Sequence, residues 1–195
     1  MVDNFMVWMI LTQLLYGNGY SLIAPFVPLE LERKGIPGAY AGVIYAMFAV
    51  AQVIVSPIVG SMFDTIGYKN LLAGGVFLMG IAIVCFGFIK DIESNLTVIV
   101  LALICRFIQG VCVGFETTAR LIIVTTDYPD QKVELIGYID AACGTCLITG
   151  PILGSILYNQ FGFKGCFLIF GGFQIVIGII TRFMLPERRK LDVSA

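Results

Sequence analysis

The residues whose types and spacing could do chemistry gather in one long apolar run, 96–125. Its polar members are Arg106, Gln109, Glu116, Thr117 and Arg120. At 3.6 residues per turn, Arg106, Thr117 and Arg120 share one face of a helix, together with Gly110 and Val113. Glu116 precedes Arg120 by four residues, the spacing at which helical side chains form ion pairs. The pattern predicts a charge network that can hold or release a proton. Alternatively, Arg106 is structural and bonds backbone carbonyls of neighbouring helices.

A further carboxylate, Asp140, lies about one turn inside the apolar run 134–158. A carboxylate at that depth could take up and release a proton. The alternative is that Asp140 lies at the wet interface and only ties helices together. The same run continues with Gly150, Pro151 and Gly154, which predict close packing and bending of the helix.

The first apolar run, 5–28, contains Gln13, Tyr16 and Asn18 before two prolines. Polar residues in a spanning helix either line a wet cavity or form hydrogen bonds to a neighbouring helix. Both interpretations carry equal weight for these three side chains.

Composition requires that these residues lie in a membrane. Apolar residues make up 58% of the chain and charged residues 13%, against about 25% charged residues in an ordinary soluble domain. The net charge of −1, without a basic block, argues against nucleic acid as a partner. Cys143 and Cys146 have the spacing of a metal or redox pair, but the chain has no histidine, so we expect no metal site and no cofactor.

Six runs are long and apolar enough to span a bilayer, which takes about 20 residues. They cover 5–28, 39–63, 70–89, 96–125, 134–158 and 164–185. The sequence therefore predicts an all-α membrane protein with one bundle of six transmembrane helices.

The basic residues predict the orientation of this bundle. With both termini on the cytoplasmic (or matrix) side, the inner set is Lys69, Arg120, Lys132, Arg182, Arg188, Arg189 and Lys190, and the outer set is Arg33, Lys34, Lys90 and Lys164. The larger inner set favours that orientation, and the cluster after Pro186 supplies most of the difference.

One stretch of the sequence occurs twice. The segment from Pro57 through Gly60 to Gly67 and Lys69 returns 94 or 95 positions later, as Pro151, Gly154, Gly162 and Lys164. This spacing divides the chain into two units, about 1–94 and 95–195, each with three predicted helices. An odd number of helices places the second unit upside down in the membrane, so we expect a 3+3 inverted repeat, as in many secondary transporters.

Three motifs resemble those of the amino-terminal half of a major facilitator superfamily transporter, most closely the drug:proton antiporters and vesicular amine transporters. The segment Gly60 to Lys69, with Asp64 and Gly67, resembles the family's G-x-x-x-D-x-x-G-R-K loop. The segment from Arg106 to Gly110 is similar to the family's R-x-x-Q-G motif. The segment from Gly150 to Gly154 is similar to its G-P-x-x-G motif. The resemblance covers essentially the whole chain and implies that Gly60, Asp64, Gly67 and Lys69 belong to an inner gate.

The chain also departs from the family's pattern. Thr65 and Tyr68 stand where the loop motif often has arginine, and Cys146 and Ser155 where the antiporter motif usually has glycine. Tyr16 occupies about the position of a first-helix aspartate in vesicular amine transporters, which argues against a cationic amine as cargo.

The leading hypothesis is proton-coupled secondary transport of a small organic solute. In it, Asp140 or Glu116 carries the proton and Arg106 holds one of them in its charged form. Because the family builds its cleft between two six-helix halves, we expect a second half, from a homodimer or a partner chain. The alternative is a non-transporting structural subunit of a larger membrane complex that reuses this fold. An enzyme is not expected, because no nucleophile constellation or metal set is present.

Overall fold

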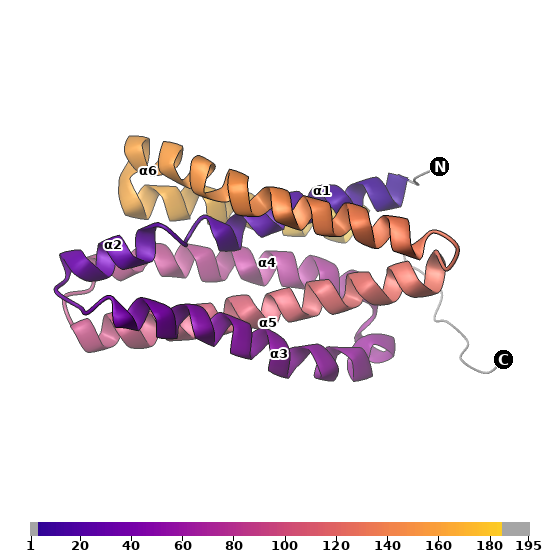
Figure 1. The fold of residues 1–195 in the computed structure, drawn as a ribbon, viewed down its shortest axis with the longest axis horizontal. Helices are drawn as coiled ribbons and strands as arrows, with labels where there is room; N and C mark the ends of the chain where they lie inside the picture. Colours follow the sequence, from indigo (N-terminus) through magenta and orange to yellow (C-terminus); the bar gives the residue numbers. More distant parts are fainter. Residues whose placement is uncertain (1–3, 185–195) are drawn as a thin grey trace.

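The computed structural model describes residues 4–184, apart from the side chains of Asn4 and Asp64. Its elements in chain order are α1 (Asn4–Ser21), α2 (Phe26–Arg33), α3 (Ala39–Ile66), α4 (Tyr68–Gly87), the 3-10 turn η1 (Phe88–Asp91), α5 (Asn95–Asp127) and α6 (Lys132–Met184) (Figure 1). The helices lie roughly along one common axis, and the described part of the chain contains no strand. The all-α prediction is therefore confirmed for these residues.

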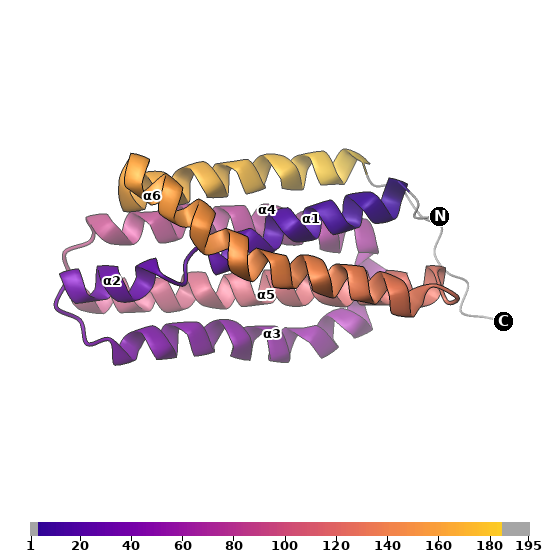
Figure 2. The same cartoon turned by 45° about the horizontal axis from the view of Figure 1, so that its top comes forward.

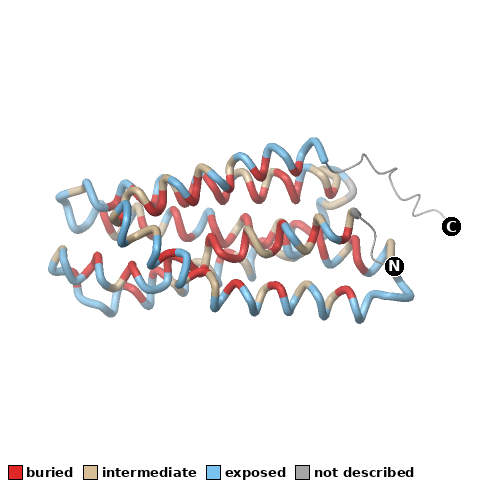
Figure 3. The backbone as a smooth tube through the Cα atoms, turned by 90° about the horizontal axis from the view of Figure 1, so that it is seen from above, coloured by how far each residue is buried: buried red, intermediate tan, exposed pale blue. Residues whose placement is uncertain are grey.

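Four of the described segments are long and apolar enough to cross a membrane: Ala39–Phe63, Tyr68–Asp91, Asn95–Asp127 and Lys132–Met184. Their outer surfaces carry large apolar side chains, such as Val53, which is 73% exposed, and Ile148, which is 68% exposed. The tube in Figure 3 has exposed stretches along the outside of the helices and buried stretches where they face one another. This distribution suits a hydrocarbon solvent and not water.

The first predicted run, 5–28, is interrupted. α1 ends at Ser21 and α2 begins at Phe26. Pro25 explains the break, because it has no N–H to donate and its ring would clash with the carbonyl of Ser21 in a continuous helix. Short turns bridge the gap, with the Phe26 N–H donating to the Ile23 carbonyl at 3.1 Å.

The last two predicted runs, 134–158 and 164–185, belong to one element with a sharp kink. α6 folds back on itself at Gly162, and its two arms diverge from that bend (Figure 2). Gly162 has φ 68° and ψ −175°, and Gly67, between α3 and α4, has φ 78° and ψ 143°. Only glycine adopts this backbone region readily. These two glycines are equivalent in the sequence repeat, and both reverse the chain.

Small residues let the helices approach closely. At Gly80 of α4, an added Cβ would lie 2.8 Å from the carbonyl oxygen of Gly171 in the second arm of α6. At Gly110 of α5, it would meet the carbonyl oxygen of Phe48 in α3. α5 therefore lies against α3 and α4, while the second arm of α6 lies against α4 and the first arm against α1. Within the polar face of α5, Arg120 reaches Gln13 of α1, whereas Arg106 lies among aromatic rings of α3 and α4.

Candidate functional site

The centre of the candidate site is a buried charge cluster between α5 and α1. Arg120 forms an ion pair with Glu116 and donates a hydrogen bond to the side-chain oxygen of Gln13. Arg120 is 2% exposed and Glu116 is completely buried. The sequence predicted the pair from its four-residue spacing, and the structure contains it. Removal of one member of such a pair leaves a buried charge uncompensated, which costs about 3–5 kcal/mol.

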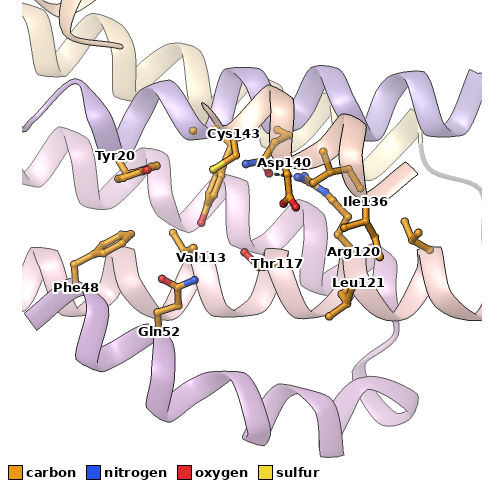
Figure 4. A pocket seen from close by; sticks show the side chains of 15 residues that line it. Tyr20, Phe48, Gln52, Val113, Thr117, Arg120, Leu121, Ile136, Asp140 and Cys143 are labelled. Carbon is orange, nitrogen blue, oxygen red and sulfur yellow. Dashed lines mark hydrogen bonds between the residues drawn. The ribbon is translucent and has the colours of Figure 1, made fainter. Parts of the chain in front are cut away.

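This cluster borders a cavity of about 350 Å³. α1, α3, α5 and the first arm of α6 form its walls (Figure 4). The lining residues are Gln13, Tyr16, Gly17, Tyr20, Phe48, Gln52, Val113, Thr117, Arg120, Leu121, Val124, Ile136, Ile139, Asp140 and Cys143. The volume is within the range of about 300–1,000 Å³ typical of small-molecule sites. The wall is mostly apolar with a few polar groups, the usual composition of a pocket for an organic solute.

Asp140 lies on the opposite wall of this cavity from α5 and is exposed. Figure 4 shows Asp140 and Arg120 at the same end of the cavity, extending from different helices. Within the described residues, Asp140 forms no hydrogen bond or ion pair, whereas Glu116 is held by Arg120. Asp140 is therefore the carboxylate that lines the cavity, whereas Glu116 is buried behind Arg120 and does not line it.

Arg106 occupies a different environment. Its guanidinium lies 5.2 Å from the ring centre of Tyr45, 5.8 Å from that of Phe48 and 5.9 Å from that of Phe86. It also donates to the side-chain oxygen of Gln109 at 3.2 Å. These rings attract the cation through their π faces.

The described part of the structure does not contain the expected pairing of Arg106 with a carboxylate. Among the described residues, Arg106 has no acidic partner, and Arg120 holds Glu116 instead. The reason is position: Glu116 lies ten residues beyond Arg106 on the helix, about 15 Å away along its axis, whereas Arg120 is one turn away.

Arg106 borders a second cavity of about 200 Å³. Tyr20 and Phe48 line both cavities, and their rings stack with centres 5.4 Å apart. Phe48, Gln52 and Tyr45 are cavity residues that the sequence alone does not single out. Their spacing of three and four residues does place them on one face of α3, but an aromatic face on an apolar helix is ordinary packing, so the pattern carries no specific signal.

The predicted cavity-lining residues divide into two groups. Gln13, Tyr16 and Thr117 border the larger cavity. Asn18 does not border it: its side-chain oxygen accepts from Thr149 at 2.7 Å, which links α1 to α6. Gln109 is completely buried under Arg106.

The motif in the first arm of α6 packs against the break after α1. An added Cβ at Gly150 would meet the Ser21 hydroxyl oxygen, and one at Gly154 would lie 2.8 Å from the ring of Phe26. The Ser21 hydroxyl donates to the carbonyl of Cys146 at 2.7 Å. Pro151 lies inside the helix and borders the second cavity. These contacts are consistent with the predicted packing role.

The expected gate motif lies at the other end of the α3–α4 pair, away from both cavities. Gly60 is exposed, Gly67 forms the reversal, and Lys69 is half-buried at the start of α4. The side chain of Asp64 is outside the described residues, as is the basic cluster Arg188, Arg189 and Lys190.

Comparison with known proteins identifies the family. Residues 9–194 match the family described as Major Facilitator Superfamily. The chain is 27% identical over 168 residues to the "MFS-type transporter SLC18B1" of Homo sapiens, covering 86% of this chain and 37% of the relative. It is 29% identical over 178 residues to the "Multidrug resistance protein MdtG" of Proteus mirabilis, covering 89% of this chain and 42% of the relative. The chain thus spans about two fifths of the length of these curated relatives. It is an integral multi-pass membrane protein and belongs to the major facilitator superfamily.

Proposed function

We propose that this chain forms one half of a proton-coupled secondary transporter for a small organic solute. Family membership and relatives named as a transporter and a multidrug resistance protein support this function. The observation that carries the proposal is the cavity of about 350 Å³ with Arg120 and the unpaired Asp140 on its walls and Glu116 buried behind Arg120 as its ion-pair partner. A carboxylate that alternates between an arginine and a proton couples solute movement to the proton gradient.

In this proposal the half has six transmembrane spans. α1 and α2 together form the first span, and the two arms of α6 form the last two. The connections at 34–38, 92–94 and Gly162 lie at one end of the bundle, and those at Gly67 and 128–131 lie at the other (Figure 1). That alternation, together with the matching glycines at 67 and 162, supports a 3+3 inverted repeat of units 1–94 and 95–195.

The distribution of basic residues supports cytoplasmic (or matrix) termini. Lys34 donates to the carbonyl of Lys90 at 3.1 Å, and Lys164 pairs with Asp91, so these residues of the predicted outer set share one end. Arg120, counted in the inner set, is buried in its ion pair and contributes nothing to orientation. With Arg120 set aside, the inner set keeps six basic residues against four in the outer set, and the whole margin comes from Arg188, Arg189 and Lys190, which lie outside the described residues.

The proposed coupling reaction uses residues of two helices. Arg120 holds Glu116 ionised, while Asp140 faces the same cavity without a partner. Protonation of Asp140 removes its charge and permits one of the two conformations between which the transporter alternates. Release of the proton permits the other conformation. Arg106 takes a different role from the one the sequence suggested: its aromatic surroundings keep a fixed positive charge beside the second cavity.

The cleft between two halves requires a second six-helix half, supplied by a second copy, a partner chain or a longer gene product. The first test is the mass and composition of the particle that contains the full chain in mild detergent. A homodimer, or a pair with another six-helix chain, supports the proposal. A large assembly of many unrelated subunits favours the alternative, a structural subunit without turnover.

Proton binding is testable without knowledge of the cargo. Infrared titration of the full chain in lipid should give a carboxyl C=O band that disappears in Asp140→Asn or in Glu116→Gln. Glu134→Gln, an exposed carboxylate at the start of α6, is the matched control and should leave the band unchanged. A band that survives both cavity substitutions refutes the coupling assignment. For any solute whose pH-driven uptake into vesicles the chain supports, Asp140→Asn should abolish that uptake.

A further inference from the structure

A third cavity lies apart from the site described above. It measures about 320 Å³ and lies between α4 and the second arm of α6. Its lining residues are Asn70, Ala73, Gly74, Phe77, Gly178, Ile179, Arg182 and Phe183. None of them lines either of the cavities beside Arg120 and Arg106. We call this region the α4–α6 groove.

The groove is deep because two of its lining residues are glycines, which have no side chain. An added Cβ at Gly178 would lie 2.7 Å from the backbone nitrogen of Phe77, so the two helices touch at that point. At Gly74 an added Cβ would meet no atom within 4 Å, which makes this glycine the open part of the floor. Phe183, 81% exposed, and Ile179, 46% exposed, stand beside it. The result is an apolar trough on the outer surface of the bundle, the shape that accepts a hydrocarbon chain.

One end of the groove is polar and positive. Arg182 is exposed and has no ion-pair partner among residues 4–184. The side-chain nitrogen of Asn70 donates to the carbonyl of Ile66 at 2.9 Å, which fixes that side chain at the start of α4. Arg182 lies in the last turn of α6, two residues before Met184, so it lies near the end of the span, where lipid phosphates are found. A guanidinium is well matched to a phosphate, because it can donate two parallel hydrogen bonds.

We propose that the α4–α6 groove binds an anionic phospholipid. One acyl chain lies over Gly74 and Gly178, and the phosphate contacts Arg182. Charge complementarity identifies this occupant, since a basic pocket between transmembrane helices on the positive side of a membrane protein attracts acidic headgroups. The sequence adds three basic residues, Arg188, Arg189 and Lys190, a few positions beyond Arg182. This proposal is independent of transport and stands whether or not the protein turns over a solute.

The test measures lipid selectivity. The full chain is reconstituted in nanodiscs of phosphatidylcholine with a minor fraction of phosphatidylglycerol. Native mass spectrometry then gives the ratio of the two lipids that remain bound. Arg182→Gln should lower the phosphatidylglycerol preference about fivefold, the effect expected for one basic residue near an anionic surface. Lys164→Gln is the charge control. Lys164 pairs with Asp91 at the end of the bundle opposite to Arg182, so its substitution should leave the lipid ratio unchanged.

A second variant tests the groove itself. Gly74→Leu places a side chain in the open floor, where an added Cβ meets no atom within 4 Å, and should displace the retained lipid. Gly172→Leu is its matched control, because Gly172 also has open space around an added Cβ and does not line the groove. Equal retention in Gly74→Leu and Gly172→Leu overturns the proposal, and so does an unchanged lipid ratio in Arg182→Gln. A disulfide-linked dimer of Phe183→Cys in the same nanodiscs also overturns it, because a second copy would then occupy the groove.

Discussion

The ion pair of Glu116 and Arg120 gives the sharpest prediction about stability. Glu116→Leu leaves the guanidinium of Arg120 with Gln13 as its only described side-chain partner, in a position that is 2% exposed. A buried charge that has lost its counter-ion costs about 3–5 kcal/mol. For a chain of this size each kcal/mol corresponds to about 2–4 °C, so the melting temperature should fall by about 6–20 °C.

The double variant Glu116→Leu/Arg120→Met separates this effect from ordinary packing loss. It removes both charges and replaces them with apolar side chains of similar length. Such replacements of a whole buried pair are often neutral or stabilising. We therefore expect the double variant to recover most of the melting temperature that the single variant loses.

Thiol labelling provides the assay. Cys112 and Cys166 are completely buried, so a thiol-reactive dye labels them only when the bundle opens. Because Cys85 is exposed and reacts at once, unfolding is read as the further labelling that appears on heating in detergent. Glu134→Leu serves as the control, because Glu134 is exposed and should change stability by less than about 0.5 kcal/mol. If the double variant melts as low as or lower than Glu116→Leu, the argument that the pair compensates its own charges is wrong.

Three further predictions follow from the backbone and the second cavity. Gly162→Ala should lower the free energy of unfolding by about 1–3 kcal/mol, because the φ of 68° at this position suits only glycine. Gly172→Ala, with open space around an added Cβ, should be tolerated, and thermal unfolding measures both variants. Gly110→Leu should drive α5 away from α3 and prevent stable packing of the bundle, so the monodisperse peak in size-exclusion chromatography should be lost. Gly60→Leu, with open space around an added Cβ, should keep that peak. Arg106→Ala should abolish solute uptake although the protein still inserts, and uptake at the original rate would refute its role beside the second cavity.

Much of the architecture could be predicted from the sequence, because a bilayer imposes simple rules. A run of apolar residues without charges must form a helix there, and the structure has helices at every predicted run. The features of the fold that the sequence did not predict depend on single backbone positions. Hydropathy does not register the break at Pro25, since the residues on both sides remain apolar. It equally misses that only Gly162 separates the two arms of α6.

The candidate site was predictable only where its residues lie on one helix. The Glu116–Arg120 pair follows from helical spacing, but the contact of Arg120 with Gln13 joins α5 to α1 and depends on their packing. The same limit applies to Asn18, whose partner Thr149 is 131 positions away. Helical periodicity describes which face a residue occupies, and it contains no information about which helix that face meets.

The two arginines illustrate why depth alone does not assign a role. Both are 2% exposed, and each needs compensation for its buried charge. The charge of Arg120 is compensated by the Glu116 carboxylate. Protonation of Glu116 would therefore remove the counter-ion of Arg120. The charge of Arg106 is compensated by three aromatic rings and an amide, none of which changes charge under ordinary conditions. In the proposed coupling, a proton-dependent change of charge is therefore expected beside Arg120, and Arg106 is suited to provide a constant field. Because Tyr20 and Phe48 line both cavities, a solute that separates their stacked rings would pass from one arginine to the other.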